Sequence, residues 1–326
     1  MTITDKLYGS FKVDEPVIIE LLESAAIKRL EGISQHGYTS QARPYNFSRL
    51  EHSLGVFLLL RKYGASLDEQ IAGLIHDAAH AVFSHTIDYV GGRQSGGRQD
   101  HQDKIQAGYI KRTDIPAVLA KHGFDLAHIL DDNNFPLKES PLPELCADRL
   151  DYSLRLARLW EKLDDSSLAK LLDNLETKNG KWLFKDQEKA RQYAELFLFL
   201  NQNYYAGLSG AAMHESVSRY LNHALKQGYI SEDDLYATEP EILSRLASFH
   251  GQDRVLEELF SRMNELGRYR HDPEKGEEEI VLKSRVVDPS FLGDSGHTIR
   301  LSEAWPRWKE VVAKELAPKS YRLYFA

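Results

Sequence analysis

Three histidines and one aspartate fall within ten residues of an otherwise apolar stretch, IAGLIHDAAHAVFSH, at residues 71–85. They are His76, Asp77, His80 and His85. The apolar neighbours indicate a buried segment, and burying ionisable side chains costs free energy unless they are paired or bind a metal. Imidazole and carboxylate groups together are typical ligands of divalent transition metals. The stretch therefore predicts metal-assisted chemistry on a segment that also packs in the core.

Two more ionisable residues stand in apolar helical segments elsewhere, His52 in RLEHSLG and Asp148 in CADRLDY. In a helix of about 3.6 residues per turn, His76 and His80 share one face, whereas Asp77 is rotated from His76 by about 100°. One ion contacts both His76 and Asp77 only if other segments complete its coordination, and His52 and Asp148 are the candidates. Such a ligand set suits one ion of Mn, Fe, Ni, Co or Zn better than Mg.

The elements that must position these residues are mostly helical. Capping boxes at Ser48 and Ser66 predict where two helices begin. The first helix carries His52, the second carries the whole apolar stretch described above, and a third over about 143–162 carries Asp148. Packing of these three helices would bring the ionisable groups together.

The last sixty residues combine β-like and helical segments, whereas the preceding chain is mainly helical. We therefore expect a mainly α fold with a helical domain at 1–268, whose core motifs lie at 45–160. A small mixed α/β C-terminal subdomain at 269–326 is expected to follow. The Asn179-Gly180 pair, between short alternating segments, predicts a β-hairpin.

Composition limits the classes of function. The chain has 326 residues, 42% of them hydrophobic and 28% charged, as in an ordinary globular protein. A net charge of −8 and a pI near 5.9 argue against a protein that coats nucleic acid or anionic membranes, but a local site for a small anion remains compatible with them. A single cysteine and a start without an apolar leader favour the cytoplasm. Apolar runs are too short for a membrane span, and homo-oligomerisation is left open.

His52, His76, Asp77 and Asp148 match the H…HD…D signature of the HD superfamily of metal-dependent phosphohydrolases, which this chain resembles. RLEHSLGV, IAGLIHDAAHAVFSHTID, DHQDK, ADRLDY and IKRLEGISQHGY are similar to motifs of its deoxynucleoside triphosphate triphosphohydrolase branch, which includes the sterile-alpha-motif/HD-domain enzyme. The similarity covers about residues 15–160. It implies an HD-domain helical bundle in which these four residues hold one catalytic metal, with room for a second.

The resemblance also implies roles for further residues. The candidates for acid–base chemistry and phosphate contact are His80, His85, Asp88 and His101. His101 matches the family's candidate general acid, a role that suits a side chain whose pKa lies near neutrality. The candidates for substrate contact are Gln35, Arg49, Arg149 and Tyr152. Guanidinium groups bind phosphate oxygens, and an aromatic ring packs on a sugar or base.

These residues predict a metal-dependent phosphohydrolase acting on a nucleotide or a related phosphate ester, with dNTP triphosphohydrolysis as the leading interpretation. The alternatives are a nucleotide phosphomonoesterase or phosphodiesterase, a non-hydrolytic nucleotide-sensing HD module, and an oxygenase in which His80 or His85 binds a second iron. The triphosphate branch carries an H-R-x-x-Y pattern in a later helix. The corresponding segment here, GLSGAAMHESV, lacks Arg and Tyr at those places, which favours the alternatives.

Overall fold

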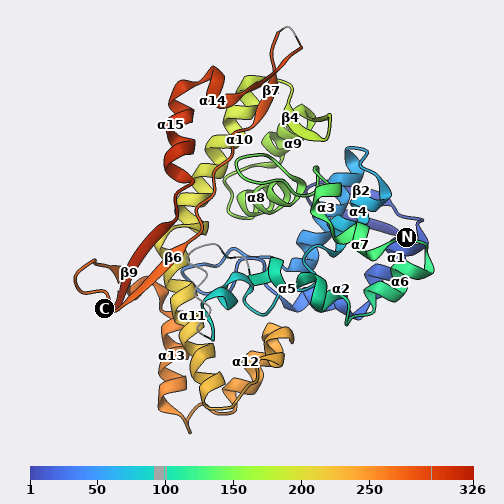
Figure 1. Cartoon of the computed structure of the whole chain (residues 1–326). Helices are drawn as coiled ribbons and strands as arrows, with labels where there is room; N and C mark the ends of the chain where they lie inside the picture. The colour runs from blue at the N-terminus through green and yellow to red at the C-terminus, as the bar shows by residue number, and fades with distance from the viewer. Residues whose placement is uncertain (92–98, 100, 295) are drawn as a thin grey trace.

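The computed structural model describes residues 1–91, 99, 101–294 and 296–326, and it is mainly helical, as predicted (Figure 1). The α-helices of the first half are α1 (Pro16–Glu23), α2 (Ala25–Lys28), α3 (Arg49–Lys62), α4 (Leu67–Ile75), α5 (His101–Ile110), α6 (Ile115–Lys121), α7 (Leu126–Leu130) and α8 (Ala147–Leu159). Those of the second half are α9 (Asp165–Asn174), α10 (Gln187–Leu200), α11 (Leu208–Lys226), α12 (Glu239–Ala247), α13 (Arg254–Asn264), α14 (Leu301–Ala304) and α15 (Pro306–Glu315). Short 3₁₀ segments are η1 (Arg29–Gly32), η2 (Ser84–Tyr89), η3 (Asp132–Asn134), η5 (Asp233–Tyr236) and η6 (Leu266–Arg268), and η4 (Asn201–Tyr205) is a short π-helix.

The two capping serines begin helices where the sequence predicted them. The Ser48 hydroxyl accepts a hydrogen bond from the Glu51 amide, and the Glu51 carboxylate accepts one from the Ser48 amide, so α3 opens with a complete capping box. The Ser66 hydroxyl likewise accepts from the Glu69 amide at the start of α4. These caps satisfy amides that have no partner inside the helix, and they fix where α3 and α4 enter the core.

The prediction that one helix runs through residues 71–85 is wrong, because α4 ends at Ile75. The Arg29 guanidinium donates hydrogen bonds of 2.8 Å to the carbonyls of both Ala78 and His80, so a distant side chain satisfies groups that a helix would have used. Phe83 then adopts a left-handed φ of 56°, which turns the chain into η2. Long-range contacts thus override a local pattern that favours a helix.

The described strands form three small antiparallel or mixed sheets. They are β1 (Thr2–Asp5), β2 (Gly9–Lys12), β3 (Leu175–Lys178), β4 (Lys181–Phe184), β5 (Tyr269–His271), β6 (Glu278–Leu282), β7 (Ser290–Leu292), β8 (Thr298–Arg300) and β9 (Lys319–Phe325). The strand orders are β1-β2, β3-β4-β7-β8 and β5-β9-β6. The hairpin predicted at Asn179-Gly180 is confirmed, since Lys178 pairs with Lys181 across it. The hairpin β1–β2 was not foreseen.

The strands after residue 268 contribute to two different sheets. The β7 strand runs parallel to β4, with Leu183 opposite Ser290, and thereby joins the C-terminal segment to the β3–β4 hairpin. The strands β5, β6 and β9 instead form their own sheet against α11. The division into domains at residue 268 stays a prediction. No helix in the described part of the chain has both the length and the apolar character needed to cross a membrane.

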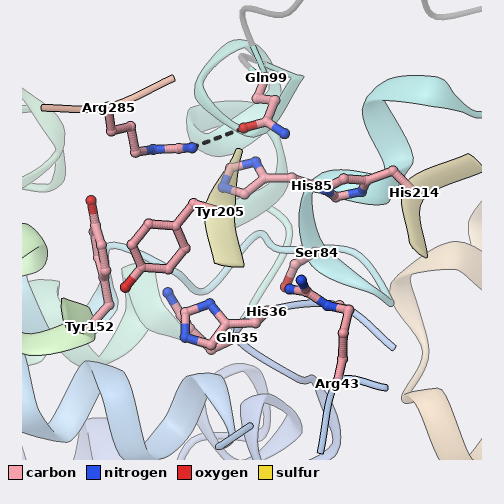
Figure 2. Close-up of a pocket in the computed structure, with 11 residues that line it drawn as sticks. Gln35, His36, Arg43, Ser84, His85, Gln99, Tyr152, Tyr205, His214 and Arg285 are labelled. Carbon is pink, nitrogen blue, oxygen red and sulfur yellow. Dashed lines mark hydrogen bonds between the residues drawn. The ribbon is translucent and has the colours of Figure 1, made fainter. Parts of the chain in front are cut away.

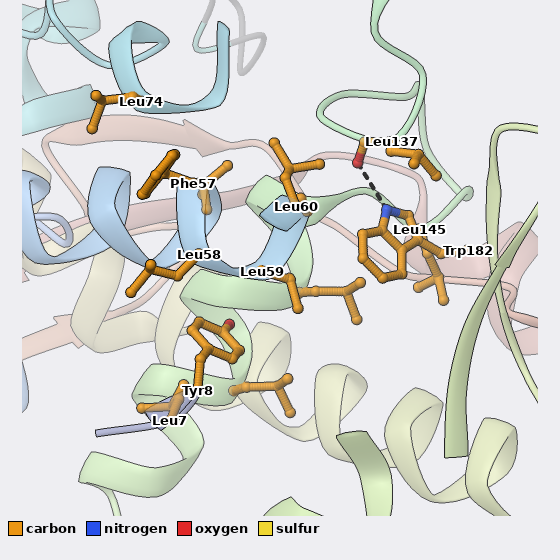
Figure 3. Packing of buried hydrophobic residues seen from close by; sticks show 14 of the residues in the cluster. Leu7, Tyr8, Phe57, Leu58, Leu59, Leu60, Leu74, Leu137, Leu145 and Trp182 are labelled. Atoms are coloured by element: carbon orange, nitrogen blue, oxygen red, sulfur yellow. Dashed lines mark hydrogen bonds between the residues drawn. The ribbon is translucent and has the colours of Figure 1, made fainter. Parts of the chain in front are cut away.

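Buried apolar side chains gather in two clusters. The first joins α1, α3, α4, α8 and α10, and Figure 3 shows Phe57 and Leu60 of α3 facing the region of Leu74 and Trp182. The second joins η2, α11, α12, α13 and the three-stranded sheet. The segment after α4 leaves the first cluster at Ala78 and enters the second shortly afterwards. The ionisable residues of this segment therefore lie where the chain crosses between two apolar cores.

Candidate active site

Three helix ends bring the four predicted metal ligands together. His52 lies one turn into α3 and is completely buried, His76 caps the C-terminus of α4, and Asp148 lies in the first turn of α8. The Nε2 atom of His52 is 2.8 Å from Asp148 Oδ1 and 3.8 Å from Asp77 Oδ2. The Nε2 atom of His76 is 3.6 Å from Asp148 Oδ1. Packing of α3 against both α4 and α8 produces this convergence.

The donor atoms of this cluster fit a divalent metal ion. Ligand atoms of His52, His76 and Asp148 all lie within 4.8 Å of one another. The Nδ1 atom of His76 is 2.7 Å from the Gly73 carbonyl, so it donates its proton there and leaves the Nε2 lone pair free for a ligand. This Nε2 atom is buried and has no hydrogen-bond partner in the described chain. An orphaned acceptor beside two carboxylates could therefore hold a metal of the transition series.

Asp77 links the cluster to two further predicted residues. Its Oδ2 atom accepts a 2.6 Å hydrogen bond from Arg49, and its Oδ1 atom lies 3.4 Å from His76 Nε2 and 3.2 Å from His80 Nε2. Burial alone would raise the pKa of Asp77, but the Arg49 guanidinium and the neighbouring imidazoles hold it well below its usual range. Asp77 is thus an ionised carboxylate at neutral pH, as a metal ligand must be.

A buried chain of charges behind His52 was missed in the sequence. The Nδ1 atom of His52 is 2.8 Å from Asp151 Oδ2, Asp151 receives two hydrogen bonds from Arg155, and Arg155 reaches Asp5 at 3.0 Å. Burial alone would lower the pKa of His52, but hydrogen bonds with Asp148 and Asp151 raise it to about 9. The available signal was the spacing of the two aspartates in ADRLD, which puts Asp148 and Asp151 on one helix face.

Of the other residues predicted for catalysis, some line the cavity beside the metal cluster and others do not. His80 and His85 line the cavity beside the cluster, with their rings 5.4 Å apart. Asp88 lies 3.7 Å from His85 Nδ1 and accepts a hydrogen bond from the His101 amide. The His101 ring is not among the groups lining this cavity in the described chain, and its Nε2 atom lies 3.2 Å from the Tyr236 hydroxyl. The role of His101 as general acid stays a prediction.

The residues predicted for substrate contact all border the same cavity, which measures about 640 Å³. Gln35, Arg49 and Tyr152 face it, although Arg49 is already engaged by Asp77. Arg149 also lines it, but its guanidinium donates to the carbonyls of Ser140 and Glu144 and so fixes the loop before α8. Arg149 therefore shapes the wall as well as adding charge to it.

Three cations of the cavity were not anticipated. Lys138 precedes α8 and pairs with Asp132, whereas Lys283 and Arg285 come from the segment after β6. No local pattern marks these positions, because only tertiary packing brings the loop before α8 and the segment after β6 to the cavity. The site is therefore richer in positive charge than its motifs indicated.

Asp148 also belongs to a second close cluster, which it forms with Glu139 and Cys146. The Arg149 guanidinium lies among them, 3.1 Å from Cys146 Sγ and 3.4 Å from a Glu139 oxygen. Burial raises the pKa of Cys146 well above its usual range, so this thiol is protonated at neutral pH. A cation and a thiol in this place do not fit a second metal ion.

The fold and the site define a class of protein: the HD-domain metal-dependent phosphohydrolases, to which this chain belongs. The HD domain profile matches residues 49–176, which include the whole cluster. A metal-dependent phosphohydrolase of Cordyceps militaris, cns2, is 34% identical over 267 residues, covering 79% of this chain and 76% of that one. The protein is accordingly a hydrolase of this family.

Two further proteins resemble the chain over nearly all of its length. The uncharacterized protein YdhJ of Bacillus subtilis is 34% identical over 297 residues, 90% of each chain. The crystal structure of a phosphohydrolase from Bacteroides thetaiotaomicron superimposes with a TM-score of 0.70, covering 100% of this chain and 99% of that one at 15% identity. At that identity the superposition shows a shared fold and no more.

Proposed function

We propose that this hydrolase cleaves a phosphate ester of a nucleotide, with His52, His76, Asp77 and Asp148 holding one divalent metal ion. The observation that carries the proposal is the placement of His76, Asp77 and Asp148 on the wall of a cavity that also presents Tyr152 and several cations. Cations compensate phosphate charge, and an aromatic side chain offers a face for a sugar or base. The combination suits an anionic substrate with a flat or ring-shaped part.

When bound by these residues, the ion would lower the pKa of a water molecule and polarise a phosphoryl oxygen. Arg49 donates to Asp77 and keeps that carboxylate ionised and oriented. Burial and the charge of Arg49 lower the pKa of His80 to about 3, so His80 is a neutral hydrogen-bonding group next to Asp77. These side chains position water and phosphate oxygens without adding competing charge.

His85 is our candidate for proton transfer to the leaving oxygen. It lines the cavity, and its Nδ1 atom faces the Asp88 carboxylate at 3.7 Å. Burial lowers the pKa of His85 in the free protein, but an anionic phosphate in the cavity favours the protonated imidazolium. The His101 ring lies at Tyr236, and its backbone amide donates to Asp88 and so helps to hold that carboxylate beside His85.

A deoxynucleoside triphosphate is the leading substrate, and a nucleoside monophosphate is the second candidate. The resemblance of the motifs supports the first. One feature of α11 supports the second: the residues one turn either side of His214 on this helix, Gly210 and Ser218, are uncharged, so α11 itself supplies no cation for a polyphosphate tail.

A turnover assay tests the proposal. Protein stripped with a chelator is reloaded separately with Mn, Fe, Co, Ni, Zn or Mg and offered dNTPs, nucleoside monophosphates and bis-p-nitrophenyl phosphate. We expect metal-dependent release of phosphate or polyphosphate, its loss in Asp77→Asn, and its retention in Asp272→Asn. The second variant is a matched control, because Asp272, which directly follows β5, belongs to another HD dipeptide and is not among the residues that line the cavity. Absence of turnover of every ester with every metal would overturn the proposal.

A further inference from the structure

A small inner pocket adjoins the cavity of the metal cluster (Figure 2). It measures about 70 Å³, and it shares Gln35, His85, Gln99, Tyr152 and Arg285 with the larger cavity. Six further residues line only the inner pocket: His36, Gly37, Arg43, Ser84, Tyr205 and His214. Because the two spaces share a wall, a ligand at the metal cluster can extend into the inner pocket.

Arg43 is a buried cation at this pocket, only 3% exposed. Its guanidinium donates to the Tyr204 carbonyl at 3.0 Å and to the Ser209 hydroxyl at 3.2 Å, and it stacks over the Tyr204 ring at 3.8 Å. Its Nε atom is buried without a hydrogen-bond partner, and the guanidinium forms no ion pair with any carboxylate that the structure describes. A buried cation without a counter-charge is costly, and a bound anion would remove that cost.

Arg285 brings a second guanidinium to the same pocket. Its terminal nitrogens donate to the Gln99 side chain at 2.9 Å and to the Lys283 carbonyl at 3.1 Å, and no described carboxylate forms an ion pair with it. Figure 2 shows Arg285 and Arg43 reaching the pocket from opposite edges, with Tyr205 and His85 between them. The backbone of Arg285 is itself anchored, since its amide donates to Asn201 at 2.9 Å.

Several neutral polar atoms of the pocket also lack partners. The Oε1 atom of Gln35, the Nε2 atom of His36 and the hydroxyl of Tyr205 are buried and make no hydrogen bond within the described chain. Burial, followed by the charge of Arg43, lowers the pKa of His36 well below its usual value and that of His214 to about 3. These histidines are neutral, so the pocket's positive charge resides on the two arginines.

We propose that the inner pocket binds a second phosphate group of the substrate, while the ester that is cleaved lies at the metal cluster. This inference rests on the proposed phosphohydrolase function and specifies its substrate class as molecules with two or more phosphate groups. Two guanidinium groups facing one small space match the charge of a phosphate and the geometry of its oxygens. An uncharged sugar or base there would leave both cations without a counter-charge.

The test compares substrates and variants in the full-length, metal-loaded protein. We measure kcat/KM for a nucleoside bisphosphate or triphosphate and divide it by kcat/KM for the matching monophosphate. This ratio is compared among wild type, Arg285→Gln and Arg43→Lys. Arg285 is half-buried and in a loop, so Arg285→Gln is expected to fold even if the Arg43 variant does not. The matched control is Arg191→Gln, which removes an exposed guanidinium of α10 far from the pocket.

Arg285→Gln is expected to lower that ratio at least about tenfold, the effect of losing one charge-assisted hydrogen bond. The control should leave the ratio unchanged. Comparing bisphosphates with triphosphates distinguishes a phosphate on another position of the nucleoside from one in a polyphosphate tail. A ratio in Arg285→Gln equal to that of wild type would overturn the inference.

Calorimetric titration with inorganic phosphate supplies a readout independent of turnover. Wild type is expected to bind one phosphate ion more per chain than Arg285→Gln, because the phosphate site at the metal is kept in both. If no ester is hydrolysed but this extra phosphate site is present, the proposed function fails and the pocket assignment stands. If hydrolysis occurs and both proteins bind phosphate equally, the pocket assignment fails and the proposed function stands.

Discussion

Asp151→Asn is the substitution that isolates how the buried charge chain supports the metal cluster. Asp151 is completely buried and is not among the residues lining the cavity of the metal cluster, yet its Oδ2 atom lies 2.8 Å from His52 Nδ1. In a metal-bound state, His52 must keep a proton on Nδ1 and offer the Nε2 lone pair. A carboxylate behind the ring fixes that tautomer and makes the imidazole a better donor. Asparagine keeps the size of the side chain but removes its charge.

The size of the effect follows from this geometry. Loss of an outer-shell carboxylate from a ligating histidine lowers metal affinity by about 10- to 100-fold, or about 1.4–2.8 kcal/mol. Unfolding measurements should also show reduced stability, because Arg155 loses a partner that holds it with hydrogen bonds of 2.7 and 3.1 Å. Breaking a buried pair in this way is destabilising, although Asp5 still neutralises Arg155 at 3.0 Å.

Metal affinity is measured by competition with a chromophoric chelator at a temperature where the variant is fully folded. The matched control is Asp5→Asn, which removes the carboxylate at the other end of the chain and has no contact with His52. We expect a fall in affinity of at least tenfold for Asp151→Asn and a smaller one for Asp5→Asn. A folded Asp151→Asn protein whose metal affinity stays within about threefold of wild type would refute this reasoning.

Three other predictions concern pH, packing and the loop around the site. Because the pKa of His52 is raised to about 9, the metal-free protein should lose stability as the pH rises from about 6.5 through 9, and pH-dependent melting measures this loss. Metal affinity should instead rise over the same range, because binding requires a deprotonated imidazole, and chelator competition measures that rise. Gly55→Ala should lower the free energy of unfolding by about 1–3 kcal/mol, because the added Cβ would lie 2.0 Å from Asp151 Oδ1; denaturant unfolding measures this change. Glu239→Ala should reduce both stability and kcat, because this buried carboxylate accepts the Ser34 amide at 2.9 Å; equal kcat in the folded variant would contradict that.

The sequence was sufficient to predict the residues that meet at the cluster. His52, His76, Asp77 and Asp148 converge, as their match to the H…HD…D signature implied; capping boxes predicted where α3 and α4 begin, whereas α8 begins without a side-chain cap. The path of the chain after His76 could not be predicted, since the Arg29 side chain ends the helix from a distance. The sequence pattern of residues 76–85 is still that of a helix, but the end of α4 at Ile75 changes where the side chains of these residues point.

The charge of the site was the least predictable feature. Arg43 and Arg285 lie in segments without regular secondary structure and are far apart in the sequence, so only tertiary packing brings both to one pocket. The support of His52 by Asp151 was predictable in principle from helix spacing, but nothing local shows that α3 packs on that face of α8. Motifs identify the reacting groups, whereas substrate selection depends on contacts made by the rest of the fold.

Elemental analysis of the purified protein, in parallel with its Asp148→Ala variant, tests the central claim most directly. The claim is that the cluster of His52, His76, Asp77 and Asp148 binds the metal on which hydrolysis depends. We expect close to one divalent transition-metal ion per chain in wild type and a small fraction of that in the folded variant. A wild-type protein that retains no metal after incubation with any of the candidate ions, or a variant with the same metal content as wild type, would contradict the account.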